Sequence, residues 1–177
     1  MLEEAPMVCV HDGGQAHVLR AGDEVVARLV RTGATTTRAE ARDAEYDIVR
    51  VGFVRPRVVV RPKGSLSDVA ALVDPATGHG AIEFADGARY GFDWVSPAGG
   101  ECAVRDPTGR PVLTMRREVG PERAGAAIRV DRSLDRRTAT VLAMLSWHVL
   151  LLDLEDLRRP VTVYNGPERR KGPREIL

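Results

Sequence analysis

The stretch RPRVVVRPKG at residues 55–64 contains the residue types best suited to binding chemistry. In a strand, residues of one parity share a face. Four odd positions of this stretch are basic, namely Arg55, Arg57, Arg61 and Lys63. Guanidinium groups bind phosphate and carboxylate oxygens in bidentate pairs, so this basic stripe is a candidate site for an anion such as a lipid headgroup. The two prolines favour an edge strand, which supports an alternative in which charge and proline only prevent sheet aggregation.

A second group of basic residues lies near the end of the chain. Its members are Arg158, Arg159, Arg169, Arg170, Lys171 and Arg174, opposed by Glu168 and Glu175. Basic segments of this kind are attracted to anionic membranes. The alternative interpretation is a solubilising tail, and the Pro/Gly-broken segment 160–177 is predicted to be flexible.

Residues for catalysis or metal binding form no recognisable set. The histidines are His11, His17, His79 and His148, and they lack the spacing of three or four zinc ligands. No G-x-S-x-G, P-loop or G-x-G-x-x-G motif occurs. Cys9 and Cys102 stand apart and are expected to be reduced thiols, with Cys102 a small core residue. We therefore predict no catalytic residue, no metal and no cofactor.

Composition narrows the class of protein. The chain of 177 residues has 26 Lys and Arg against 25 Asp and Glu, a net charge of +1, so a dedicated nucleic-acid binder is not expected. Lysine occurs only at Lys63 and Lys171, and this preference for arginine suggests a bacterial genome rich in G and C. The acidic start MLEEAPMVCVHDGG does not resemble a signal peptide. The expected location is the cytoplasm, with peripheral contact at the inner membrane as a further option.

The elements that must position these residues are mostly strands. Turn signals such as Asp86-Gly87 recur about every ten residues from residue 75 onward, a spacing typical of all-β folds. Residues 89–95 alternate, with Tyr90, Phe92 and Trp94 on one face. Further strands are predicted at 24–31, 46–54, 57–61, 79–84, 101–105, 110–117 and 126–131. The polar segment 31–44 is predicted to be a long loop.

One segment near the end of the chain predicts a helix, at about 136–157. Asp135 is a suitable N-cap and Pro160 a suitable stop. Arg136 and Arg137 lie unfavourably at the positive end of the helix dipole. The run 139–152 carries no formal charge and no polar stripe, so the helix must be buried. At 14 residues, about 21 Å, this run is short for a membrane span.

A mostly β chain can bury such a helix only by wrapping a sheet around it. We therefore predict an antiparallel β-barrel of about ten to twelve strands around one hydrophobic C-terminal helix. His148 would be a buried neutral histidine bonded to a barrel carbonyl. The predicted core includes Tyr90, Phe92, Trp94, Leu113, Met115, Leu145, Trp147 and Leu151.

The order of these elements resembles the tubby C-terminal-like superfamily, which includes phospholipid scramblases and LURP-one-related proteins. The likeness is carried by DGARYGFDW at 86–94, CAVRDPTGRPVLTMRR at 102–117 and VLAMLSWHVLLL at 141–152, and is clearest over residues 79–156. It implies a barrel of roughly twelve strands threaded by the helix, and a binding role without established catalysis. Tubby domains bind phosphoinositides through a basic patch, but their lipid-binding loops do not match positions here.

Together these patterns predict one barrel domain at 1–159 and a basic tail at 160–177. The expected function is non-enzymatic binding of an anionic lipid headgroup or a protein partner through a basic surface. The alternative is a small-molecule binder or enzyme that uses a cavity at the barrel mouth.

Overall fold

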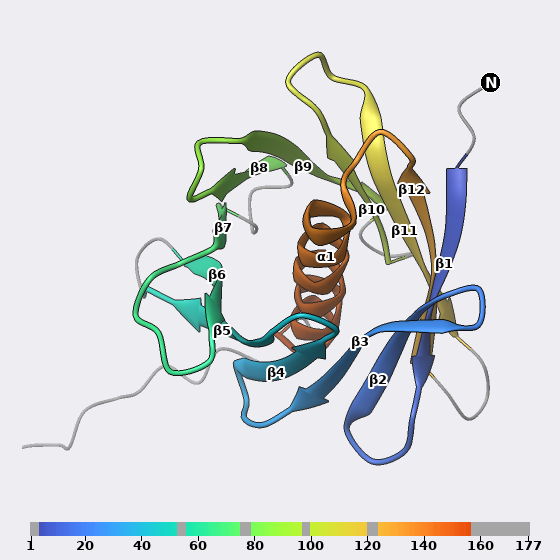
Figure 1. Cartoon of the computed structure of the whole chain (residues 1–177), viewed down its shortest axis with the longest axis vertical. Helices are drawn as coiled ribbons and strands as arrows, with labels where there is room; N and C mark the ends of the chain where they lie inside the picture. The colour runs from blue at the N-terminus through green and yellow to red at the C-terminus, as the bar shows by residue number, and fades with distance from the viewer. Residues whose placement is uncertain (1–3, 53–55, 75–78, 97–99, 120–123, 157–177) are drawn as a thin grey trace, which may run out of the picture.

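A closed barrel of twelve strands surrounds a single helix in the computed structural model of this chain (Figure 1). The structure describes residues 4–52, 56–74, 79–96, 100–119 and 124–156. The strands are β1 (Glu4–His11), β2 (Ala16–Ala21), β3 (Glu24–Arg31), β4 (Thr36–Ala41), β5 (Glu45–Val51), β6 (Arg57–Pro62), β7 (Ala70–Val73), β8 (His79–Phe84), β9 (Arg89–Ser96), β10 (Glu101–Arg105), β11 (Pro111–Val119) and β12 (Ala124–Asp131). The helix is α1 (Arg136–Asp156). The predicted fold class is confirmed.

The sheet follows the simplest order that closes a barrel. Each strand pairs antiparallel with the next along the chain, and β1 pairs with β12, where Met7 lies opposite Ile128. Closure leaves no strand with a free edge. At this seam the two backbones approach closely, since a Cβ atom on Gly125 would lie 2.7 Å from the carbonyl oxygen of Cys9.

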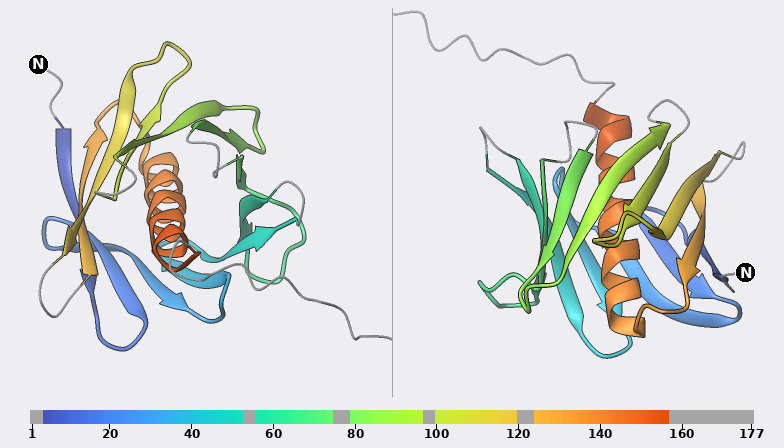
Figure 2. Two further views of the ribbon diagram at one scale, coloured as in Figure 1. Left: turned by 180° about the vertical axis from the view of Figure 1, so that it is seen from behind. Right: turned by 90° about the horizontal axis from the view of Figure 1, so that it is seen from above.

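The helix runs lengthwise through the barrel (Figure 2). Strand residues of one parity face it, and they form a single apolar core with the helix side chains. Trp147, Phe92, Leu113, Met115 and Leu145 are completely or almost completely buried, as predicted. The other predicted core residues, Tyr90, Trp94 and Leu151, are partly buried against this core.

Two local predictions are wrong. Residues 36–41 form β4, although the segment 31–44 was expected to be a loop. The inward positions of β4 carry Thr37 and Ala39, which are too small to give an apolar signal. In addition, β6 is not an edge strand, because it pairs with β5 on one side and β7 on the other. Pro56 precedes β6 and Pro62 ends it, so the prolines flank this paired strand.

The start of the helix agrees with its predicted cap. The carboxylate of Asp135 accepts a hydrogen bond of 3.0 Å from the backbone N–H of Thr138. Hydrogen bonds from the side chain of Thr138 and then from its backbone lower the pKa of Asp135. The described helix ends at Asp156, one residue before the predicted end. No helix among the described residues is long and apolar enough to cross a membrane. The predicted tail at 160–177 lies outside the described residues.

Candidate ligand-binding pocket at the barrel mouth

The basic stripe lies on the outer face of β6 and just beyond its end, and much of its charge is already paired. Arg61 donates to the carboxylate of Asp68 at 2.6 Å, and the ammonium of Lys63 donates to Glu45. Arg57 is exposed. Arg55 lies outside the described residues. An anion at this stripe would therefore compete with two acidic side chains for the cations that bind it.

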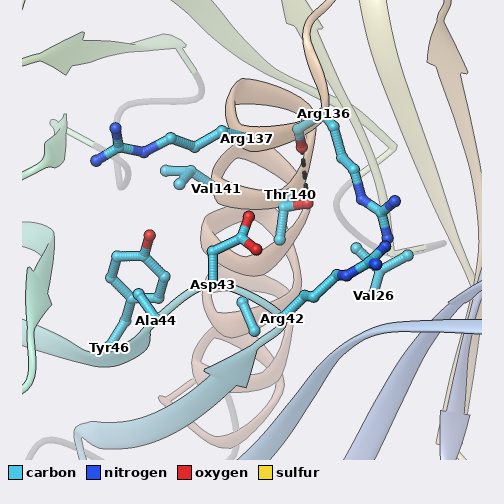
Figure 3. Close-up of a pocket in the computed structure, with 10 residues that line it drawn as sticks. Val26, Arg42, Asp43, Ala44, Tyr46, Arg136, Arg137, Thr140 and Val141 are labelled. Atoms are coloured by element: carbon cyan, nitrogen blue, oxygen red, sulfur yellow. Dashed lines mark hydrogen bonds between the residues drawn. The ribbon is translucent and has the colours of Figure 1, made fainter.

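A more enclosed site lies at the mouth of the barrel where α1 begins. A cavity of about 380 Å³ opens between the first turns of the helix, β3, and the turn from β4 to β5 (Figure 3). This volume lies within the range of small-molecule pockets. The apolar part of its lining comes from Val26, Ala41, Ala44, Tyr46 and Val141. The polar part comes from Arg42, Asp43, Arg136, Arg137 and Thr140.

An ion-pair clamp fixes one side of this pocket. The Glu24 carboxylate at the start of β3 accepts hydrogen bonds from Arg136 at 2.5 Å and from Arg42 at 3.2 Å. The bond from Arg136 is the main cause of a lowered pKa at Glu24, and the same bond raises the pKa of Arg136. The clamp ties the helix start to two turns of the barrel wall and uses the charge of both arginines.

Three other polar groups of the pocket form no hydrogen bond or close ion pair with the residues described. Arg137 and Asp43 form no ion pair within 4 Å in the part of the chain that the structure describes, and both are exposed, although Asp43 also attracts Arg136 and helps to raise its pKa. Tyr46 is only 5% exposed, yet its hydroxyl has no hydrogen-bond partner among the residues described. In Figure 3 this hydroxyl points toward the side of the pocket over which Arg137 extends. This hydroxyl is not a buried unsatisfied atom, because the pocket opens onto it, and a ligand there can replace solvent as its partner.

The sequence analysis gave a cavity at the barrel mouth as its alternative but named none of the residues that line it. The lining comes from Val26 and from the segments 41–46 and 136–141, which the barrel brings together only on closing. One signal pointed to it, namely Arg136 and Arg137 at the wrong end of the helix dipole. The structure accounts for their position: Glu24 compensates Arg136, and Arg137 faces the pocket.

The hydroxyl of Thr140 in the pocket and the two thiols of the chain are each hydrogen-bonded or buried. Among the pocket residues described, the one hydroxyl besides Tyr46 belongs to Thr140, which donates to the carbonyl of Arg136 at 2.8 Å. The thiols of Cys9 and Cys102 lie in the core as free cysteines, and burial raises the pKa of each to about 12. A thiol rather than a thiolate at neutral pH is a poor nucleophile.

Two buried histidines lie deeper in the barrel, one on β2 and one on the helix. The ring of His17 on β2 contacts Trp147 edge-on, with centroids 4.9 Å apart. A hydrogen bond of 2.9 Å joins Nδ1 of His148 to Oγ1 of Thr37. His148 is buried as predicted, but its partner is this hydroxyl rather than the expected carbonyl. Burial lowers the pKa of both histidines to about 4, so both are neutral at pH 7.

A second hollow of about 750 Å³ lies on the outer face of β10, β11 and β12. Its lining alternates acidic and basic side chains, including Glu101, Arg116, Glu118 and Arg129. The apolar side chains that line this hollow are Met115 and Ala127, whereas five residues with apolar surface line the mouth pocket, so the pocket at the barrel mouth is the stronger candidate site.

Comparisons with protein-family models, with curated proteins and with solved structures find no match to this chain.

Proposed function

We propose that this chain is a binding protein without enzymatic activity, and that it holds a small molecule with an anionic group at the barrel mouth. The observation that carries this proposal is the uncommitted guanidinium of Arg137 beside a cavity with an apolar lining. A guanidinium at the mouth of a pocket with apolar lining favours a ligand with one anionic end and one apolar end. Among the pocket residues described, the absence of an activated nucleophile supports a binding role.

The binding function can be tested by isothermal titration calorimetry with 4-methylpentanoate and with inorganic phosphate. We expect saturable binding of the carboxylate, weakened at least about tenfold by Arg137→Ser, since each tenfold step corresponds to one lost interaction of ordinary strength. Arg89→Ser removes an exposed arginine of β9 that does not line this pocket, and it serves as the matched control. Equal binding by wild type and the Arg137 variant would overturn the proposal for this pocket.

We propose binding of an anionic membrane by the basic stripe as a second candidate function, supported by the exposed Arg57. The pairing of Arg61 and Lys63 makes this candidate weaker. Its test is co-sedimentation with neutral and anionic vesicles at two salt concentrations, using a variant with Arg55, Arg57, Arg61 and Lys63 all changed to Ser. Salt-sensitive binding to anionic vesicles that this variant loses would support it, and binding that the variant keeps would overturn it.

The twelve-stranded barrel around a hydrophobic helix supports a further proposal, that the chain belongs to the tubby-like superfamily, which the order of its hairpins resembles. The proposed pocket does not depend on that membership. It depends only on the side chains that line it.

A further inference from the structure

Some polar groups around the mouth pocket already form hydrogen bonds or ion pairs within the protein, and we call these committed; the others are uncommitted. Arg42 and Arg136 are held by Glu24, and the hydroxyl of Thr140 is held by the helix backbone. The uncommitted set consists of one cation, one anion and one hydroxyl, namely Arg137, Asp43 and Tyr46. This uncommitted set determines which ligand the pocket prefers.

Arg137 and Tyr46 suit a carboxylate. The Arg137 side chain reaches out from the helix above Val141, and the Tyr46 hydroxyl points up toward the same region (Figure 3). A guanidinium donates two parallel hydrogen bonds to a carboxylate, and a phenol can add a third. Tyr46 is 5% exposed as a whole, but its hydroxyl is not a buried unsatisfied atom and is open to the pocket, where it can donate to a ligand oxygen.

Asp43 argues against a bare anion. Its carboxylate lies in front of the helix in the middle of the pocket, between the Arg137 side and the Arg42–Arg136 side (Figure 3). Both neighbouring arginines on the second side already share Glu24. A ligand with only negative charge would be repelled by Asp43, whereas a ligand with only an amine would be repelled by Arg137. A ligand that carries both charges would pair with both side chains.

The rest of the lining determines which uncharged part of a ligand can fit. Val26, Ala44 and Val141 offer apolar surface beside the charged groups. A cavity of about 380 Å³ lies at the small end of the range for ligand pockets. This combination fits a small molecule whose two charges lie close together and whose side chain is apolar.

Resting on the proposed binding function, we infer that the ligand of the mouth pocket is a small zwitterion, an α-amino acid with an apolar side chain. Arg137 and Tyr46 bind its carboxylate, Asp43 binds its ammonium, and Val26, Ala44 and Val141 contact its side chain.

The inference is tested by calorimetric titration with three molecules that differ by one charged group, leucine, 4-methylpentanoate and 3-methylbutylamine. Phenylalanine, 3-phenylpropionate and phenethylamine form a second set with a larger side chain. We expect the amino acid of at least one set to bind at least about tenfold more tightly than its acid and its amine, as the loss of one charge pair predicts.

Two variants locate the charges. Asp43→Asn should weaken binding of the amino acid and strengthen binding of the acid. Arg137→Ser should weaken binding of the amino acid and of the acid, and it should leave binding of the amine unchanged or stronger. Both positions are exposed, so the variants should fold, and Arg89→Ser, at an exposed position outside the pocket lining, is the control. Tyr46→Phe, which keeps the buried ring, should weaken the amino acid and the acid alike.

The outcomes separate this inference from the proposed function. If the acid binds as well as the amino acid and Asp43→Asn improves both, the zwitterion is excluded while the anion-binding function stands. If only the amine binds, the inference and the proposed function both fail. If none of the six molecules binds, the amino-acid inference is overturned, and binding of phosphate then decides whether the proposed function survives.

Discussion

His148 of the central helix and Thr37 of β4 are 111 positions apart in the chain and are joined by a hydrogen bond of 2.9 Å. Together with the contact between His17 and Trp147, this bond sets the rotation of the helix inside the barrel, because it pairs particular helix residues with particular strands. Most other contacts of the helix are apolar and permit neighbouring packings. The two buried histidines therefore contribute to the specificity of the fold as well as to its stability.

Acid should destabilise the protein through these histidines. Their pKa is 6.5 in an unfolded chain and about 4 in the fold, chiefly because of burial, with smaller effects from His11 on His17 and from Arg31 on His148. Above about pH 6.5 both histidines are neutral in the folded and in the unfolded protein, so the stabilisation is complete. As the pH falls from 6.5 toward 4 the unfolded state binds protons first, so about 2 kcal/mol per histidine is lost by about pH 5.

The measurement is urea unfolding at several pH values between 7.5 and 5. The double variant His17→Phe with His148→Leu should show a smaller loss of unfolding free energy over this interval, whatever its stability at pH 7.5. If the unfolding free energy of the double variant depends on pH as steeply as that of the wild type, other groups cause the acid sensitivity.

Trp147→Ala should be strongly destabilising. The indole is fully buried at the centre of the barrel and packs against His17, so its removal leaves a large cavity. We expect a loss of about 3–5 kcal/mol in the free energy of unfolding, measured by urea denaturation. Leu66→Ala is the control, since Leu66 is 91% exposed and should change stability by less than about 0.5 kcal/mol. A mild effect of Trp147→Ala would mean that the surrounding core collapses into the space.

Two glycine substitutions test the closure of the barrel. In Gly125→Ala the new methyl group would lie 2.7 Å from the Cys9 carbonyl oxygen on β1, so the seam between β12 and β1 must shift. We expect a loss of about 1–3 kcal/mol. In Gly91→Ala the nearest atom would be the Cβ of Arg105 at 3.9 Å, and this variant should be neutral or slightly stabilised. Thermal unfolding of the two variants side by side provides the measurement, and equal effects would argue against a tight seam.

Glu24→Gln tests the clamp at the start of the helix. The substitution removes the charge that holds Arg42 and Arg136, so the melting temperature should fall at low salt. Since all three side chains are partly open to solvent, salt screens their attraction, and the difference from wild type should shrink in 1 M NaCl. A difference that persists at high salt would indicate a packing defect instead.

The architecture could be predicted because its strongest signals are local. The ranges 24–31, 79–84 and 101–105 were predicted to the residue. The helix was identified by its lack of a polar face. That property also required an enclosing sheet, since an isolated helix of this kind cannot remain in water.

Four strands were not predicted, because their inward residues give weak signals. The missed strands are β1, β2, β4 and β7. In β4 the inward residues are small or polar, and in β7 only four residues are present, with Ala70 and Leu72 facing the core. The pairing partners of β6 were also not predictable, since proline at both ends of a strand looks the same whether the strand is central or at an edge.

The candidate pocket was beyond sequence reasoning for a different reason. The effect of each charge in the pocket depends on which other charges lie beside it. Glu24 and Arg136 form a hydrogen bond although they are 112 positions apart in the chain. The sequence showed an unfavourable pair of arginines at a helix start. Only the closed barrel shows which of the two is neutralised and which one faces the cavity.

The position of the helix in the chain has a consequence for synthesis. A ribosome releases all twelve strands before it releases α1, so the wall of the barrel is made before the core that it must surround. Until then the inward apolar residues have no helix to cover them, and at an earlier stage, before β12 is made, β1 lacks its partner at the seam. Such long-range closure is slow, and exposed sheet edges invite association with other chains. The nascent protein should therefore depend on chaperones until its last described element has emerged.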